Sequence, residues 1–326
     1  YVPGYTPEGP DGEPLTTADP SNPSSGYLPP NPTNPGEDTV ITYVPADQVG
    51  SVTYIDATTG TTLSVDPLAG KSDEPGTYST ADRIKQYEAM GYVLVTDGYP
   101  TDFTFDSDTA KSQDFTVTLK QVTVVVTPDD PKNPSDPIFT PGDPVDPSDP
   151  SSPTYPEEPG TPGDPIDPNN PSGPTWPTTP TYPTGVTAQD LNKTVTRTIT
   201  YVYEDGSEAA TTVTDNVVFE RTATVNAVTG EVTYGEWTAV GDDVDWQQVD
   251  SPMIVGYMAD KASVEFVDVT GATESTSVVV TYTAVGQWVP HFPPGTEDVP
   301  SDPINYPNNP DDPTNPADPG PDNPAD

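Results

Sequence analysis

The placement of proline most constrains how this chain can fold. Of 46 prolines in 326 residues, only five lie within residues 40–127 and 190–285. These five are Pro45, Pro67, Pro75, Pro100 and Pro252. Because proline is excluded from helix interiors and central strands, regular structure is predicted for these two stretches. The chain therefore divides into a spacer (1–38), a domain (39–127), a spacer (128–185), a domain (186–289) and a spacer (290–326).

Between the two domains, proline recurs at every third residue. The series runs from Pro128 to Pro137 and, after one extra residue, from Pro141 to Pro183. Three residues per turn is the repeat of polyproline II, which rises about 3.1 Å per residue without internal hydrogen bonds. Acidic residues fill many intervening positions, and their repulsion favours extension. The sequence predicts an extended polyproline II spacer of on the order of 170 Å.

The spacer sequence is itself repeated. The stretch "PSDPIFTPGDP" at 134–144 recurs with the same proline spacing as "PSDPINYPNNP" at 300–310. A repeated spacer indicates that the domains it separates are repeated too. We therefore expect a monomeric unit within a tandem array that continues beyond residue 326.

The charge excludes several classes of partner and of activity. The chain has 52 acidic and 10 basic residues, which give a net charge of -42. Phosphate backbones would repel this charge, so nucleic acid is excluded as a partner. No apolar run approaches the roughly 20 residues of a membrane span. The chain has no cysteine, and its single histidine, His291, lies outside both domains. Neither a Ser-His or Cys-His pair nor a histidine-rich metal site can form, so we predict no enzyme and no cofactor.

Two groups of residues are candidates for binding. Asp242, Asp243 and Asp245 could hold a Ca²⁺ ion through oxygen ligands, with a solvated acidic loop as the alternative. Four aromatic residues of the second domain have polar neighbours, a combination suited to carbohydrate, although large aromatics in a small β domain also form its core. These four are Tyr234, Trp237, Trp246 and Tyr257. Trp176 and Trp288 flank the second domain and are expected to pack on its ends.

The first domain has the pattern of a hairpin, a helix and two further strands. "SVTYIDATTGTTLSV" alternates around a turn, and "YVLVTD" and "DFTVTLK" are β-rich, whereas "VTVVVT" at 122–127 is predicted to continue the last strand. A helix is predicted between these strands. Ser79 and Asp82 form its potential capping box, Ile84 and Tyr87 lie on its apolar stripe, and Gly91 is placed to end it. This order predicts a β-grasp (ubiquitin-like) domain.

The second domain is richer in strand. "TVTRTITYVYEDGSEAATTVTDNVVFERTATV" gives two long runs around "EDGS", and "NAVTGEVTYGEW" a hairpin closed at Thr229 and Gly230. "ASVEFV" and "TSVVVTYT" supply the final strands. The shared order suggests a distant copy of the first domain, so the fold class predicted for the chain is mainly β with one short helix (α+β).

Several of these stretches resemble a known family. "YSTADRIKQYEAMGYVLVTDGYP", "TRTITYVYEDGSEAATTVTDNVVFERTATVNAVTGEVTYGEWTAV" and "SPMIVGYMADKASV" are similar to the two halves of the mucus-binding repeats (Mub, MucBP type) of lactobacillus surface adhesins. The resemblance covers both domains, somewhat over half of the chain. It implies β-grasp-like halves on an exported, cell-wall-anchored protein that attaches bacteria to mucus glycoproteins, with immunoglobulin binding as a second activity. The proline ladder, our name for the run of prolines at every third residue over 128–183, departs from the family pattern.

Two functions follow. In one, the domains bind mucin glycans or other host glycoproteins directly. In the other, the unit is a structural stalk that projects a distal binding domain from the bacterial surface. The family resemblance favours binding and the proline ladder favours the stalk.

Overall fold

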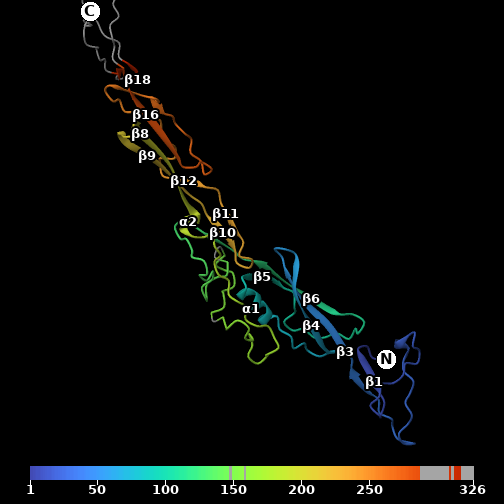
Figure 1. Ribbon diagram of the computed structural model, residues 1–326. Coiled ribbons are helices and arrows are strands. Elements are labelled where there is room, and N and C mark those ends of the chain that lie inside the picture. Colours follow the sequence, from blue (N-terminus) through green and yellow to red (C-terminus); the bar gives the residue numbers. More distant parts are fainter. Residues whose placement is uncertain (147–148, 158, 287–307, 310–311, 317–326) are drawn as a thin grey trace, which may run out of the picture. The chain divides into compact units, whose positions relative to one another are not determined.

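The computed structural model describes residues 1–146, 149–157, 159–286, 308–309 and 312–316, which form two compact units (Figure 1). Unit 1 comprises Tyr1–Val125, Asn133–Thr184 and Thr224–Val232. Unit 2 comprises Val126–Lys132, Gly185–Ala223 and the described part of Thr233–Asp326. The prediction for the last spacer, and that for Trp288, fall largely or wholly outside the described residues.

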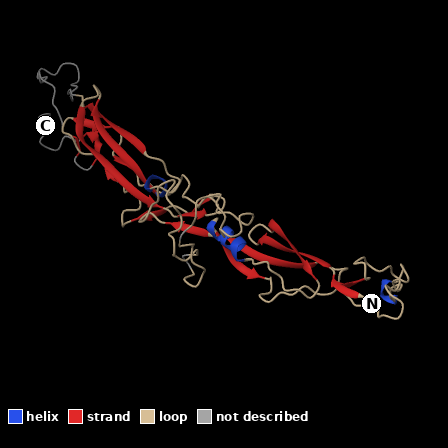
Figure 2. Cartoon of the chain, turned by 90° about the horizontal axis from the view of Figure 1, so that it is seen from below, coloured by secondary structure: helices blue, strands red, loops and turns tan. Residues whose placement is uncertain are grey.

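Strands predominate and helix is confined to short segments (Figure 2). The helices are α1 (Ala81–Ala89), α2 (Ala188–Leu191) and a 3-10 turn, η1 (Pro23–Ser25). None of the helices in the described ranges is long and apolar enough to cross a bilayer. The fold is therefore mainly β, as predicted, although α2 was not expected.

A mixed four-stranded sheet forms the centre of unit 1. Its strands are β3 (Asp47–Asp56), β4 (Thr61–Lys71), β5 (Tyr92–Asp97) and β6 (Gln113–Gln121), in the order β4-β3-β6-β5. β3 pairs antiparallel with β4 and parallel with β6, and β5 pairs antiparallel with β6. The predicted order of hairpin, helix and two strands is confirmed.

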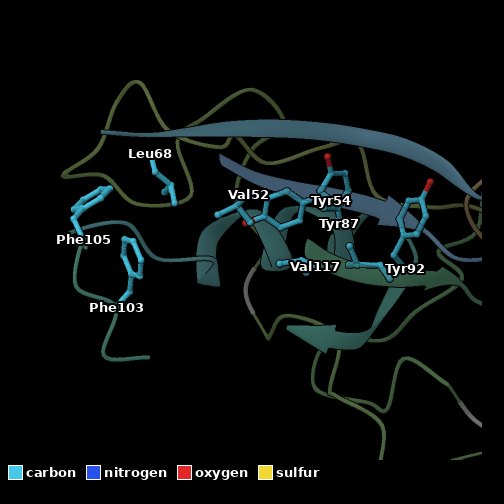
Figure 3. Close-up of a cluster of buried hydrophobic side chains, with 9 residues drawn as sticks. Val52, Tyr54, Leu68, Tyr87, Tyr92, Phe103, Phe105 and Val117 are labelled. Atoms are coloured by element: carbon cyan, nitrogen blue, oxygen red, sulfur yellow. The ribbon is translucent and has the colours of Figure 1, made fainter. Parts of the chain in front are cut away.

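One face of this sheet is covered by α1, and the core lies between them. Alternation along β3 places Val52 and Tyr54 on this face, and both are fully buried. Figure 3 shows Tyr87 of α1 beside Tyr54, and their ring centroids are 5.7 Å apart. The Tyr87 hydroxyl donates to Ser64 Oγ at 2.7 Å. The apolar stripe predicted for the helix therefore faces the core.

The start of α1 differs from the prediction. Thr80 occupies the N-cap position without a side-chain capping bond, and Ser79 Oγ accepts a hydrogen bond from the Ala81 amide at 3.2 Å. The capping box of Ser79 and Asp82 is therefore absent, because the helix begins one residue later than the pattern required. At the other end, Gly91 has φ of 97°, the left-handed conformation that glycine tolerates after a helix.

The segment predicted to be an extended spacer is folded onto unit 1. Residues 133–184 belong to that unit, and five of their apolar side chains are buried, those of Phe139, Val145, Tyr155, Trp176 and Tyr182. The Gly142 amide donates to Tyr155 O at 3.0 Å, and the Tyr155 amide to Asp143 O at 2.7 Å, so this stretch turns back on itself. The extended polyproline II prediction for 128–185 is therefore wrong for these residues.

The physical reason is burial of the residues between the prolines. Phe139 and Tyr155 stack with ring centroids 5.0 Å apart, and the Tyr155 hydroxyl donates to Ala89 O of α1 at 3.1 Å. Trp176 is also buried in unit 1, with Lys85 Nζ 5.2 Å from its ring centroid, and does not plug an end of the second domain as expected. An extended helix without internal hydrogen bonds offers no compensation for leaving these rings in water.

The outer parts of the first domain also differ from prediction. Near the N-terminus β1 (Tyr5–Glu8) pairs antiparallel with β2 (Thr42–Pro45), so residues 1–38 contribute to folded structure. The run predicted to extend β6 forms a separate strand, β7 (Thr123–Val126). It belongs to a three-stranded sheet with β10 (Ala223–Asn226) and β11 (Val232–Tyr234), in the order β11-β10-β7. The hairpin predicted at Thr229 and Gly230 exists, but its residues Thr224–Val232 belong to unit 1.

A partly buried carboxyl on α1 predicts how unit 1 responds to pH. Burial raises the pKa of Glu88 from 4.5 to about 7, against the opposing charge of Lys85. A raised acid pKa contributes stability that is complete below about 4.5 and lost as pH rises through about 7. We expect Glu88→Gln to stabilise unit 1 at pH 8, relative to pH 5, by on the order of 1 to 2 kcal/mol after solvent screening.

Urea denaturation at the two pH values measures this difference. The exposed Glu74→Gln is the control, since it removes a carboxylate from the same unit without a buried charge. The expectation fails if Glu88→Gln and Glu74→Gln shift the pH dependence equally.

Unit 2 is built on a five-stranded sheet in the order β12-β9-β8-β16-β14. Its strands are β8 (Asn192–Tyr203), β9 (Glu208–Glu220), β12 (Thr238–Val240), β14 (Tyr257–Ala259) and β16 (Thr276–Ala284). β8 and β16 pair in parallel at the centre, and the other pairs are antiparallel. β13 (Val249–Asp250) pairs with β15 (Ser263–Val264), and β17 (Asn308–Asn309) with β18 (Asp312–Pro316).

Candidate functional site

Trp246 and Tyr257, two of the four aromatic residues predicted to bind ligand, pack in or against core clusters of unit 2. Trp246 is 2% exposed, packs in a core cluster with Val195 and Phe219, and lies 5.6 Å from the guanidinium carbon of Arg197. Tyr257 is partly buried against Tyr203, with ring centroids 4.7 Å apart. Their side chains serve the interior of unit 2.

The other two aromatic residues converge on an arginine. The guanidinium carbon of Arg221 lies 3.6 Å from the ring centroid of Tyr234 and 4.3 Å from that of Trp237. Lys193 Nζ lies 5.8 Å from the Trp237 ring centroid. We call Arg221, Tyr234, Trp237 and Lys193 the Arg221 cluster. It gathers two cations and two aromatic rings, a pairing that stabilises each cation over the negative face of the ring.

Strand register brings the Arg221 cluster together. Thr238 of β12 pairs with Glu220 of β9 in antiparallel register, so Trp237, just before β12, meets Arg221, just after β9. A Cβ atom at Gly271 would lie 2.5 Å from Trp237 Cβ, so only glycine fits beside this ring. Lys193 Nζ donates to the carbonyl of the same Gly271.

Hydrogen bonding within unit 2 uses only part of the donor capacity of the Arg221 guanidinium. Its Nε donates to Asp190 O at 2.9 Å, and Tyr234 Oη donates to Gly185 O at 2.9 Å. Within the described residues, neither terminal nitrogen of Arg221 has a hydrogen-bond or ion-pair partner. Hydrogen bonds from Thr187 and, less strongly, the charge of Arg221 hold the pKa of Asp190 below its usual value. The two terminal nitrogens are therefore free to receive a ligand.

Most other cations of this acidic chain are already neutralised. Seven of the ten basic residues form ion pairs with carboxylates within 4.0 Å. In the described parts of the chain, no such pair involves Lys85, Lys193 or Arg221. Two of these three cations belong to the Arg221 cluster, so it is the place in unit 2 where positive charge is least compensated by a carboxylate.

The aspartates predicted to bind calcium do not converge. Asp242 and Asp243 are exposed, whereas Asp245 Oδ1 accepts a hydrogen bond from the Val269 amide at 3.1 Å. Throughout the described ranges, no group of three or more His, Cys, Asp or Glu side chains is arranged to hold a metal ion. The geometry gives the calcium hypothesis no support.

Sequence reasoning selected Tyr234 and Trp237 but missed Arg221 and Lys193. The available signal was the rarity of basic residues, 10 among 326, which makes each one informative. Composition around the aromatic residues does not reveal which cation will stack on them, because that contact depends on the pairing of β9 with β12.

Comparisons with known proteins identify both halves of the chain. Residues 37–121 match the family model described as a mucin binding domain, and residues 186–286 match the Muc B2-like domain. Mub-RV, a solved structure, is 28% identical with a TM-score of 0.50, and the match covers 73% of this chain and 100% of that one. A comparison with curated proteins gives no significant match.

Two further solved structures are also similar in sequence to this chain. The type 2 repeat of the mucus binding protein MUB from Lactobacillus reuteri is 27% identical, with a TM-score of 0.42, over 73% of this chain and 100% of its own. A mucin-binding domain from Streptococcus pneumoniae is 36% identical, with a TM-score of 0.26, over 29% of this chain and 92% of its own. By the two family models and the similarity to Mub-RV, the chain belongs to the family of mucus-binding repeats.

Proposed function

We propose that this chain is a repeat unit of a bacterial surface adhesin and that it binds acidic sugars of mucin or other host glycoproteins through the Arg221 cluster. The observation that carries the proposal is the guanidinium of Arg221, stacked on Tyr234 and Trp237 with both terminal nitrogens free of partners in the described residues. The match to a mucin binding domain supports the class of ligand.

The chemistry of the cluster suits a carboxylate or sulfate group. A guanidinium presents parallel N–H donors that meet such a group in a bidentate arrangement. Stacking on two rings limits the orientations of Arg221 before the ligand arrives, which lowers the entropy lost on binding. The exposed ring of Tyr234 offers apolar surface beside the charge.

The net charge determines the range of this recognition. At -42 the chain repels polyanionic mucin at long range, and physiological salt screens that repulsion beyond about 8 Å. Binding therefore has to depend on direct contact at a site where cations are not neutralised by carboxylates. This reasoning favours the Arg221 cluster over the acidic remainder of unit 2.

The β-grasp type of both units and a cell-surface location are part of the proposal. The parallel pairing of β3 with β6 and of β8 with β16 supports a common plan for the two units. The cell-surface location is supported by the family, which is one of adhesin repeats. A stalk role is compatible with binding, since each unit of a tandem array can do both.

Arg221→Gln is expected to weaken binding of the full chain to immobilised mucin about ten- to a hundredfold, the loss of a charge-assisted hydrogen-bonded contact. Surface plasmon resonance measures it, with circular dichroism as the check on folding. Arg221→Lys keeps the charge but not the parallel N–H donors of the guanidinium, so its affinity should lie between those of the original chain and Arg221→Gln. Lys261→Gln removes an exposed cation that is paired with Asp260 and should leave binding unchanged.

The ligand chemistry is tested on the mucin itself. Mucin stripped of carboxylated and sulfated sugars should bind the original chain as weakly as untreated mucin binds Arg221→Gln. The proposal is overturned if Arg221→Gln and Lys261→Gln bind untreated mucin equally well.

A further inference from the structure

Unit 1 contains a cavity of about 510 Å³, within the size range of small-ligand sites. One wall comes from β4 and from the start of α1, including Asp66, Tyr78 and Asp82. The opposite wall comes from the folded proline ladder, through Asp167 and Asn170. Residues 133–184, folded onto this unit, therefore complete the lining of the cavity.

The floor of the cavity is a locked polar network. Arg83 donates to both oxygens of Asp66, from Nε at 3.0 Å and from a terminal nitrogen at 2.6 Å. Its other terminal nitrogen donates to Gln86 Oε1 at 2.9 Å, and Tyr78 Oη donates to Asp66 Oδ2 at 2.7 Å. These groups are mostly buried, so the network orders the wall before a ligand enters.

Further groups in the lining have unused hydrogen-bonding capacity. Asp167 Oδ1 accepts two hydrogen bonds from Asn169, and no bond to its Oδ2 is found among the described residues. Asp82 is partly buried in the first turn of α1. The hydroxyl of Tyr99, which also lines the cavity, is buried without a hydrogen-bond partner in the described ranges. Such a group is costly unless a water or a ligand satisfies it.

We propose that this cavity binds a neutral pyranose sugar. Rings of Tyr78, Tyr99 and Phe105 line it together with carboxylates and amide groups. Aromatic rings suit the apolar C–H faces of a sugar ring, and carboxylate oxygens accept hydrogen bonds from its hydroxyl groups. The small number of polar groups in a fixed arrangement is what gives a concave site its specificity.

The charge of the lining distinguishes neutral from acidic sugars. Three carboxylates, Asp66, Asp82 and Asp167, line the cavity together with a single guanidinium, each of whose three nitrogens donates a hydrogen bond to Asp66 or Gln86. A carboxylated or sulfated sugar would meet uncompensated negative charge, which costs binding free energy. This preference for neutral sugars is opposite to that of the Arg221 cluster. The proposal for the cavity does not rest on the Arg221 cluster.

Filling the cavity tests the proposal. Thr77, which lines the cavity, and Glu74, which does not, are both exposed and lie in the segment between β4 and α1. The probe is the neutral fraction of oligosaccharides released from mucin, defined as the fraction that an anion-exchange resin does not retain. We expect this fraction to shift the amide resonances of Tyr78 and Asp82 in the full chain. Thr77→Trp should abolish the shifts, and Glu74→Trp should keep them.

A second variant keeps the test valid if Thr77→Trp fails to fold. Asp82→Asn preserves shape but removes a carboxylate acceptor, so we expect about tenfold weaker binding of the neutral fraction. Arg221→Gln should leave that binding intact, which separates this site from the one proposed above. The proposal is overturned if the neutral fraction shifts no resonances, if Thr77→Trp and Glu74→Trp behave alike, or if the acidic fraction shifts the same resonances more strongly.

Discussion

Replacing Arg197 with methionine is expected to lower the free energy of unfolding of unit 2 by about 3 to 5 kcal/mol. Arg197 is 1% exposed and pairs with Asp215 at 2.6 Å. It also donates to the backbone carbonyls of Glu265 and Gln247. Methionine fills much of the volume but supplies no donor, so a charge and two carbonyls lose their partner together.

Native-state hydrogen exchange in the full chain measures this change at the amides of β8 and β16, whose protection reports global opening of the sheet. Lys261→Met is the matched control, because Lys261 and Asp260 form an exposed pair that contributes at most about 1 kcal/mol. A loss of less than about 1 kcal/mol in Arg197→Met would contradict the structural role assigned to this network.

Tyr155→Ala is expected to destabilise the packing of residues 133–184 on unit 1 by about 3 to 4 kcal/mol, the range for removing a buried aromatic side chain. Tyr155 is 2% exposed, stacks on Phe139 and donates to Ala89 O. The alanine loses the stacked ring and leaves a void between the ladder and α1.

The measurement is hydrogen exchange at the Gly142 and Trp176 amides, which donate within the folded ladder. These should exchange about a hundredfold faster or more, while the amides of β3 keep their protection. Tyr43→Ala is the control, since Tyr43 is 40% exposed. Unchanged exchange of the ladder amides in Tyr155→Ala would mean that the ladder is held by other contacts.

The regular parts of unit 1 were predictable from local pattern. Alternation around Val52 and Tyr54 and the apolar spacing of Ile84 and Tyr87 each specify one buried face, and the structure buries Val52, Tyr54 and Tyr87. These periodicities report a local geometry, so they hold whatever the partner surface is.

The fold of the proline ladder was not predictable in the same way. The three-residue period describes the prolines, whereas the residues that decide the fold are Phe139, Tyr155 and Trp176 between them. Their irregular spacing gives no periodic signal, and the surface that buries them is α1, more than 40 residues earlier in the chain. Non-local burial overrides the local preference for polyproline II.

The candidate binding site was predictable only in part, for a related reason. Aromatic content pointed to Tyr234 and Trp237, but equally to Trp246, which the core absorbs. Tyr234 is 42% exposed and Trp246 is 2% exposed, and this difference depends on which strands pair. The same holds for Arg221, because the rings that stack on it, Tyr234 and Trp237, come from a later part of the chain.

The parallel strand pair within each of the two largest sheets has a mechanical consequence. β8 and β16 are joined over seven register positions, from Thr276 opposite Arg197 to Tyr282 opposite Tyr203. Because the strands run in the same direction, tension entering at the start of β8 and leaving at the end of β16 pulls them along their common axis in opposite directions. The backbone hydrogen bonds between β8 and β16 are then loaded together in shear. They must break collectively rather than one at a time. The β3 and β6 pair repeats this arrangement over Gly50 to Asp56, so resistance to such a pulling force depends on the unfolding rate under load more than on equilibrium stability.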